Sequence, residues 1–274
     1  MIDPFIDNGF MMRSLVGGSL VALACAIVGT FVVLRGLAFI GDALAHGVLP
    51  GVAIAMLVGV PAMLGAAAGA AVMIGGVSVV RSRTRLSGDS SVGLLFIGLL
   101  SLGVVIVSAA DSLTGRLEAI LFGEFLGVSD GDIAMAAIAL ALVLGMVVVS
   151  ARPFILSCFD PDLTKVMGYR SSLYEALLLV AVAGTVVVSF QTVGSLLVFG
   201  LLLAPAGVGA LVAHRVWAMI GVAALVGVVS TYLGLLASYR FGWAAGASVV
   251  LCAVLVFFVV LTIVSIARSP RWHR

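Results

Sequence analysis

Residues 37–60 have the sequence LAFIGDALAHGVLPGVAIAMLVGV, an apolar stretch in which only Asp42 and His46 are ionisable. A helix needs about 20 consecutive apolar residues to cross a bilayer. A carboxylate inside such a span is costly unless it faces a polar cavity or a partner group, so its presence indicates function. This stretch therefore predicts a membrane-spanning helix that carries a site.

The rest of the chain has the same character, with 63% hydrophobic and 9% charged residues among 274 and a mean hydropathy of +1.34. Soluble domains have about 45–50% apolar and about 25% charged residues, which argues against a water-soluble enzyme, a nucleic-acid binder and a disordered chain. We expect one all-α polytopic transmembrane domain over residues 1–274, with eight or nine transmembrane helices. Besides 37–60, the candidate spans are 14–34, 61–80, 92–110, 133–151, 174–192, 194–212, 217–237 and 246–267.

The cationic residues favour one side of the membrane. With nine spans, eleven of the 14 Lys and Arg residues lie in connections on one side, and seven acidic residues lie on the other. Because cytoplasmic connections are enriched in Lys and Arg, the N-terminus is predicted outside and the C-terminus in the cytoplasm. The acidic N-terminus does not resemble a cleavable signal, so we expect the first span to be retained. The acidic outer loop 111–132, with Glu118 and Glu124, is a candidate for attracting cations.

Asp42 and His46 are spaced to act together. Residues four apart lie about 5–6 Å from each other on one helix face. A carboxylate with an imidazole suits divalent Mn²⁺, Zn²⁺ or Fe²⁺. Two ligands do not complete a metal's coordination shell, and a symmetric homodimer would supply four. The alternative is that Asp42 only pairs with Arg35 or His46 and holds helices together.

Proline residues are expected to interrupt two spans. Pro50 has no N–H, so the carbonyl of His46 loses its helical donor, and Gly51 loosens the same turn. A broken helix beside ionisable groups is typical of transporter ion sites. Pro205 is predicted to kink the seventh span, either for packing or as a gating bend.

The cytoplasmic loop 152–173 predicts a short helix at the membrane surface. Asp160 suits its N-cap, Pro161 its first turn and Gly168 its C-terminal stop. Two interpretations remain open at this point, a lever gripped by a cytoplasmic motor protein and an ordinary interfacial helix. The residues assigned to the lever are Phe159, Asp160, Pro161, Asp162, Leu163 and Gly168.

Several motifs in order resemble the ABC-3 family, the permease subunits of bacterial ABC importers for zinc and manganese. The resemblance covers nearly the whole chain. Its motifs are residues 29–53, Leu121-Phe122-Gly123, Phe159-Asp160-Pro161-Asp162-Leu163 with Gly168, residues 193–198, Leu203-Ala204-Pro205-Ala206 and residues 245–251.

The resemblance implies a type II, cobalamin-importer-like permease in the bacterial plasma membrane. Two copies would form the pore, two separate ATPase subunits would bind the cytoplasmic face, and an extracytoplasmic solute-binding protein would deliver the metal. The metal is cargo, and no permanently bound cofactor is expected. The family's metal site maps onto Asp42 and His46, and its coupling helix maps onto residues 159–168.

Two departures from the family pattern concern Thr164, where Ala is more usual, and Phe96-Ile97-Gly98, where some zinc permeases carry a histidine. The second departure weakens the case for zinc against manganese. Other hypotheses are a permease for metal chelates and a stand-alone proton-coupled transporter or channel in which Asp42 and His46 titrate. An intramembrane metalloenzyme is remote without an HExxH motif, and the chain has no phosphate-binding loop for ATP hydrolysis.

Overall fold

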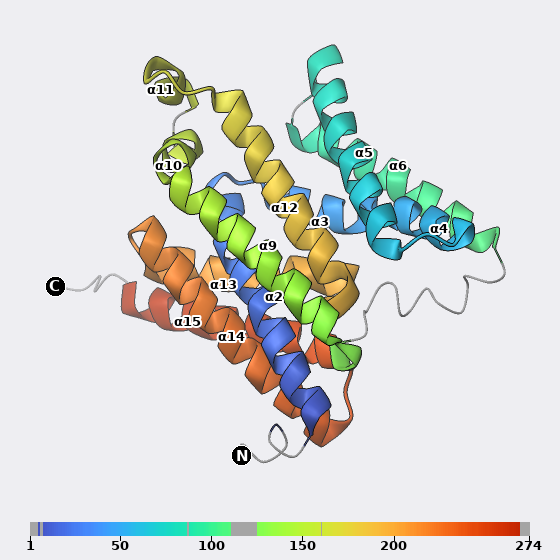
Figure 1. Ribbon diagram of the computed structural model, residues 1–274. Helices are drawn as coiled ribbons and strands as arrows, with labels where there is room; N and C mark the ends of the chain where they lie inside the picture. Colours follow the sequence, from blue (N-terminus) through green and yellow to red (C-terminus); the bar gives the residue numbers. More distant parts are fainter. Residues whose placement is uncertain (1–4, 6–7, 87, 111–124, 160, 269–274) are drawn as a thin grey trace.

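The computed structural model describes residues 5, 8–86, 88–110, 125–159 and 161–268, and within these residues every regular element is a helix (Figure 1). The elements are α2 (Gly9–Leu34), α3 (Ala38–Gly47), α4 (Leu49–Val58), α5 (Ala62–Arg83), α6 (Gly88–Ser108), η1 (Phe125–Gly127), α9 (Asp130–Val149), α10 (Ala151–Phe159), α11 (Pro161–Val166), α12 (Ser171–Val193), α13 (Ser195–Val212), α14 (Val216–Phe241) and α15 (Ala245–Arg268).

Eight of the described helices are long and apolar enough to cross a membrane, and α3 with α4 counts as one of them. Helix α13 is apolar but shorter, with Val198–Val212 as its apolar part. Each of the nine predicted spans is therefore helical, and the expectation of eight or nine transmembrane helices is confirmed. Among the described helices, the choice between the two numbers depends on α13.

Helix α2 lies at the centre of the described bundle, packed against α9, α12, α13 and α14 (Figure 1). In its most apolar window 72% of the residues are buried, against 11% in α15. Small residues allow this packing, since a Cβ atom at Gly29 would overlap the Leu202 carbonyl of α13. The apolar outer faces of α6, α9 and α15 are those expected of helices that contact lipid.

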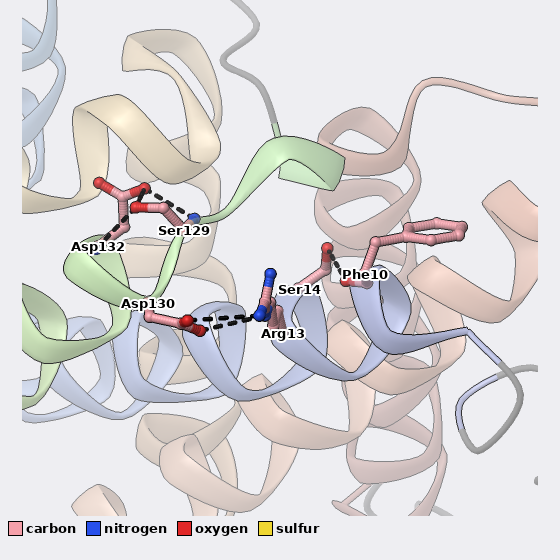
Figure 2. A network of polar contacts seen from close by, with 6 residues as sticks. All are labelled: Phe10, Arg13, Ser14, Ser129, Asp130 and Asp132. Carbon is pink, nitrogen blue, oxygen red and sulfur yellow. Dashed lines mark hydrogen bonds and ion pairs between the residues drawn. The ribbon is translucent and has the colours of Figure 1, made fainter.

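Two polar contacts test the predicted sidedness. Arg13 and Asp130 are predicted outside, and Arg13 Nε lies 3.1 Å from Asp130 Oδ1 (Figure 2). The start of α9 next to this pair is a capping box, in which Ser129 and Asp132 exchange side-chain to backbone hydrogen bonds. On the side predicted to be cytoplasmic, Arg35 Nη2 donates to the Ser157 carbonyl at 3.1 Å. Residues predicted on one side therefore meet in the fold.

Aromatic residues mark the two ends of α14. Trp217 is exposed near its start, and Tyr239, Phe241 and Trp243 are exposed at its end. From residue 217 to residue 239 the helix rises about 33 Å. A bilayer's hydrocarbon core is about 30 Å thick, and Trp and Tyr concentrate at its two surfaces. The aromatic residues therefore place α14 across the membrane.

Candidate metal site and coupling segment

The span that carries the two ionisable residues is divided into α3 and α4 at Val48. Pro50 is the second residue of α4 and cannot donate to the carbonyl four residues before it. The backbone turn continues across the break, since the Val48 N–H donates to the Leu44 carbonyl at 3.3 Å and the Val52 N–H to the Val48 carbonyl at 3.0 Å. The interruption at Val48 therefore lies two residues after His46.

Asp42 and His46, here called the metal pair, face each other on α3. The Asp42 Oδ1 atom lies 3.5 Å from His46 Nε2, and the two side chains are 27% and 15% exposed. The His46 ring packs edge-on against Phe96 of α6, with 5.7 Å between ring centroids. Its Nδ1 atom is buried and has no hydrogen-bond partner among the described residues. The pair therefore holds an unused nitrogen and a carboxylate at one place in an apolar setting.

The metal pair lies near the middle of its span. His46 is eight residues beyond Ala38, which begins α3, a rise of about 12 Å. A further rise of about 18 Å separates it from Val58, where α4 ends. An ion site at mid-membrane depth is typical of transporters with broken helices.

The described residues of one chain do not complete a metal site. Among the described residues, no group of three or more His, Cys, Asp or Glu side chains is placed to hold a metal ion. The metal pair supplies one imidazole and one carboxylate, and a divalent transition metal takes four or more ligands. Glu118 and Glu124 lie outside the described residues, so the structure does not place them.

An apolar cavity of about 400 Å³ begins beside the metal pair. It lies between α4, α5 and α6 and reaches from Gly47, next to His46, to Val58 and Leu64. Its wall depends on glycine, because a Cβ atom at Gly51 would overlap the Gly65 carbonyl of α5. Pro50 and Gly51 both line this cavity, so the predicted helix-break residues lie beside the metal pair.

Pro205, the third predicted helix-break residue, is buried inside α13. Helix α13 packs against α3, where Phe199 and Leu202 lie within 4 Å of a Cβ atom built at Gly41. Pro205 therefore lies in a helix that supports the one carrying the metal pair.

The predicted cytoplasmic helix is present as α11, which begins at Pro161 and is followed by Gly168 with φ +84°. The Tyr169 N–H donates to the Thr164 carbonyl at 3.1 Å and the Gly168 N–H to the Lys165 carbonyl at 3.0 Å. This is the Schellman pattern, which favours glycine at that position. Asp160 lies outside the described residues, as do the side chains of Pro161 and Asp162.

Residues 159–168 form the segment here called the coupling segment, and its described side chains are unusually apolar for an exposed position. Phe159 is 69% exposed and Val166 is 84% exposed, and Leu163 and Met167 are exposed as well. Apolar residues gathered at an exposed tip are typical of a docking surface. The coupling segment therefore presents an apolar surface, as both the lever and the interfacial-helix interpretations expect.

Sequence reasoning missed the roles of Arg35 and Phe96. Arg35 was considered as a cytoplasmic charge and as a pairing partner of Asp42, yet its side chain donates to the Ser157 carbonyl of α10, next to Cys158. Burial raises the pKa of the Cys158 thiol above its ordinary value, and the Arg35 guanidinium opposes this shift. Phe96 was considered only as the absence of a histidine, yet it packs on His46. No local pattern signals either contact, although an arginine directly after a long span is a hint.

The comparisons agree with this fold. The manganese transport system membrane protein MntC of Listeria innocua is 33% identical, over 94% of this chain and 92% of its own length. The solved structure of PsaBC from Streptococcus pneumoniae in complex with Fab matches with a TM-score of 0.86 at 30% identity, covering 95% of each chain.

A second structure, a metal-chelate type ABC transporter in an inward-facing conformation, matches with a TM-score of 0.72. It is 15% identical over 93% of this chain and 85% of its own, so it shows the fold alone. The membrane-length helices and these likenesses indicate a multi-pass protein of the bacterial plasma membrane. The model of the ABC 3 transport family matches residues 7–264, and the chain therefore belongs to that family.

Proposed function

We propose that the chain, as a single transmembrane domain, is the permease of an ATP-driven importer for a divalent transition metal, with manganese as its cargo. The observation that carries the proposal is the metal pair, a carboxylate and an imidazole 3.5 Å apart in the middle of a broken span. Such a pair suits Mn²⁺, Zn²⁺ and Fe²⁺. The relative MntC is named for manganese transport, which supports manganese among the three.

Phe96 also favours manganese over zinc. It lies against His46, where some zinc permeases of the family carry a histidine in the same span. A phenyl ring supplies no ligand, so α6 contributes no second imidazole at that place. Fewer nitrogen ligands make the site better suited to manganese, which accepts oxygen ligands readily.

A second copy of the chain completes the site in this proposal. Two copies related by a two-fold axis would bring two metal pairs together and supply four side-chain ligands. The incomplete ligand set within the described residues supports this arrangement. The metal is then carried between subunits and is not a resident cofactor.

The energy source is placed in separate ATPase subunits, which bind the cytoplasmic face. The coupling segment supports this step, because its exposed Phe159, Leu163, Val166 and Met167 offer an apolar contact surface. An extracytoplasmic solute-binding protein would deliver the metal at the opposite face. The chain itself hydrolyses no ATP in this scheme.

Reconstitution tests the proposal. The chain is placed in liposomes with its ATPase subunits, its solute-binding protein is added, and uptake of Mn²⁺ is measured with and without ATP. ATP-dependent Mn²⁺ uptake that is lost in Asp42→Asn supports the proposal. Uptake by the chain alone, driven by a pH gradient, would instead identify a stand-alone proton-coupled transporter, and uptake of a metal chelate but not of free metal would identify a chelate permease.

A further inference from the structure

Helix α3, which carries the metal pair, is a ten-residue unit with a break at each end. At its cytoplasmic end the chain turns at Gly36, with φ +66°, and the Leu37 N–H donates to the Val32 carbonyl at 3.0 Å. This closes α2 with a Schellman motif and places the change of direction at a single glycine. At its other end the helix is interrupted at Val48. These two breaks set α3 apart as a separate ten-residue segment between α2 and α4.

Arg35, directly before Gly36, bonds the turn between α2 and α3 to α10. Its Nη2 atom donates to the Ser157 carbonyl at 3.1 Å, across 122 residues of sequence. Helix α10 ends at Phe159, so the Ser157 carbonyl is among the last four, which have no donor within the helix. A guanidinium there also interacts favourably with the negative end of the helix dipole. The bond therefore joins the start of α3 to the helix that leads into α11.

Aromatic side chains reinforce the same connection. Phe31 of α2 and Phe154 of α10 are both 1% exposed, and their ring centroids are 5.6 Å apart. Phe154 contacts Tyr174 of α12 at 5.8 Å, and Tyr174 contacts Tyr169 at 6.0 Å. Tyr169 directly follows Gly168, the stop of α11. This aromatic ladder packs the cytoplasmic end of α2, α10 and the end of the coupling segment together.

We propose that Arg35 is a positioning residue that transmits movement of the coupling segment to the metal pair. The inference rests on the proposed function. When an ATPase subunit displaces α11, α10 moves with it and the Arg35 bond carries the movement to the α2–α3 corner. Helix α3 then turns about Gly36, which changes the side of the membrane to which Asp42 and His46 are exposed.

A purely structural role for Arg35 makes a different prediction. If the guanidinium only capped α10, its loss would reduce the number of folded molecules, and metal uptake and ATP hydrolysis would fall in proportion. If it transmits movement, uptake falls relative to ATP hydrolysis. The ratio of Mn²⁺ imported to ATP hydrolysed therefore separates the two roles.

The experiment uses the full importer in proteoliposomes, with ATPase subunits and solute-binding protein, and compares Arg35→Ala, Arg35→Lys and Arg83→Ala. Arg83 is the matched control, an exposed arginine at the cytoplasmic end of α5. We expect Mn²⁺ uptake per ATP to fall between about two-fold and thirty-fold in Arg35→Ala, the range seen for residues that modulate coupling. Arg35→Lys, which keeps one donor, should fall less, and Arg83→Ala should match the unmodified importer. Mn²⁺ affinity should be unchanged in all three.

Wild-type coupling ratios in Arg35→Ala and Arg35→Lys would overturn the inference. Loss of Mn²⁺ affinity in Arg35→Ala would also overturn it, because the residue would then belong to the metal site. If Arg35→Ala does not assemble, the ratio in Arg35→Lys decides, and a wild-type ratio counts against the inference. Failure of the unmodified importer to take up Mn²⁺ would refute the proposed function instead, so the two failures are distinguishable.

Discussion

The Oδ1 atom of Asp42 lies 3.5 Å from the Nε2 atom of His46, one turn further along α3, while the opposite ring nitrogen of His46 is buried without a hydrogen-bond partner among the described residues. The contact lies within one short helix and needs no neighbour to form. In the proposed site a bound metal would take the place of the contact between Asp42 and the Nε2 atom of His46, and both side chains would then be ligands.

Removal of either ligand should therefore abolish metal binding. Asp42→Asn and His46→Ala are each expected to reduce Mn²⁺ affinity by more than about 100-fold, since even the loss of a residue that only orients a ligand costs about 10- to 100-fold. Isothermal titration of the purified importer with Mn²⁺ measures this change. Asp130→Asn is the matched control, because it removes an exposed carboxylate at the start of α9, on another helix, and should leave the affinity unchanged. Wild-type affinity in Asp42→Asn would exclude the site.

The stop of α11 provides a second test, at Gly168. A side chain with a Cβ atom is strained at φ +84°, by about 1–2 kcal/mol for most residues. Asparagine tolerates this conformation better than β-branched residues. We expect Gly168→Val to lower Mn²⁺ uptake per ATP hydrolysed and Gly168→Asn to lower it less. Equal coupling in both variants and the unmodified importer would count against a role for this segment.

The Cys158 thiol should be slow to react. Burial raises its pKa above the ordinary value, and the nearby Arg35 guanidinium only partly opposes the shift. A raised pKa leaves less thiolate at a given pH, about tenfold less for each unit by which the pKa is higher. The rate of alkylation by iodoacetamide should therefore continue to rise with pH, beyond the pH at which the rate for an ordinary thiol reaches its plateau. Mass spectrometry of the modified peptides measures the rates.

Val166→Cys supplies the comparison for this experiment, because residue 166 is 84% exposed in the same segment. Its rate should level off near the ordinary thiol pKa, about 8.5. If Cys158 and the introduced cysteine show the same pH profile, the environment described for Cys158 is wrong.

Most of the fold was predictable because its determinants are local. Each apolar run of sufficient length is helical whatever it packs against, since a backbone in lipid must satisfy its own hydrogen bonds. The contact between Asp42 and His46 was predictable for the same reason, as residues four apart on a helix are neighbours. The end of α11 at Gly168 was predictable because glycine adopts the left-handed backbone conformation that commonly terminates a helix.

Contacts between distant helices were not predictable in this way. The acceptor of the Arg35 hydrogen bond is the backbone carbonyl of Ser157. Every residue has such a carbonyl, so no pattern of side chains in the sequence predicts this contact. The packing of Phe96 on His46 depends on how α3 and α6 lie together. The remaining metal ligands are assigned to a second copy of the chain, which the sequence of one copy does not position.

The outer ion pair should contribute little to stability. Arg13 and Asp130 are 54% and 78% exposed, and the pair joins α2 to α9 at 3.1 Å (Figure 2). Exposed pairs are worth about 0.2–1 kcal/mol and are weakened by salt. A double-mutant cycle with Arg13→Gln and Asp130→Asn, measured by unfolding in detergent, should give a coupling energy in this range that decreases at high salt. A larger energy that does not depend on salt would show that the pair is shielded from solvent in the membrane.

The close contact between α4 and α5 should make Gly65 intolerant of substitution. A Cβ atom there would overlap the Gly51 carbonyl and contact the Ala55 Cβ atom, whereas a Cβ atom at Gly75, ten residues along the same helix, would meet nothing within 4 Å. Overpacking of this kind costs about 1–3 kcal/mol. Gly75→Ala should be neutral or stabilising, because alanine favours a helix over glycine by about 1 kcal/mol.

Thermal unfolding of the two variants in the same detergent compares them directly. We expect a lower midpoint for Gly65→Ala and an equal or higher midpoint for Gly75→Ala. Gly65 also lines the cavity beside the metal pair, so Gly65→Ala should reduce metal uptake because it separates α4 from α5 at that wall. If Gly65→Ala unfolds at the same temperature as the unmodified chain, α4 and α5 are not in backbone contact at Gly51 and Gly65.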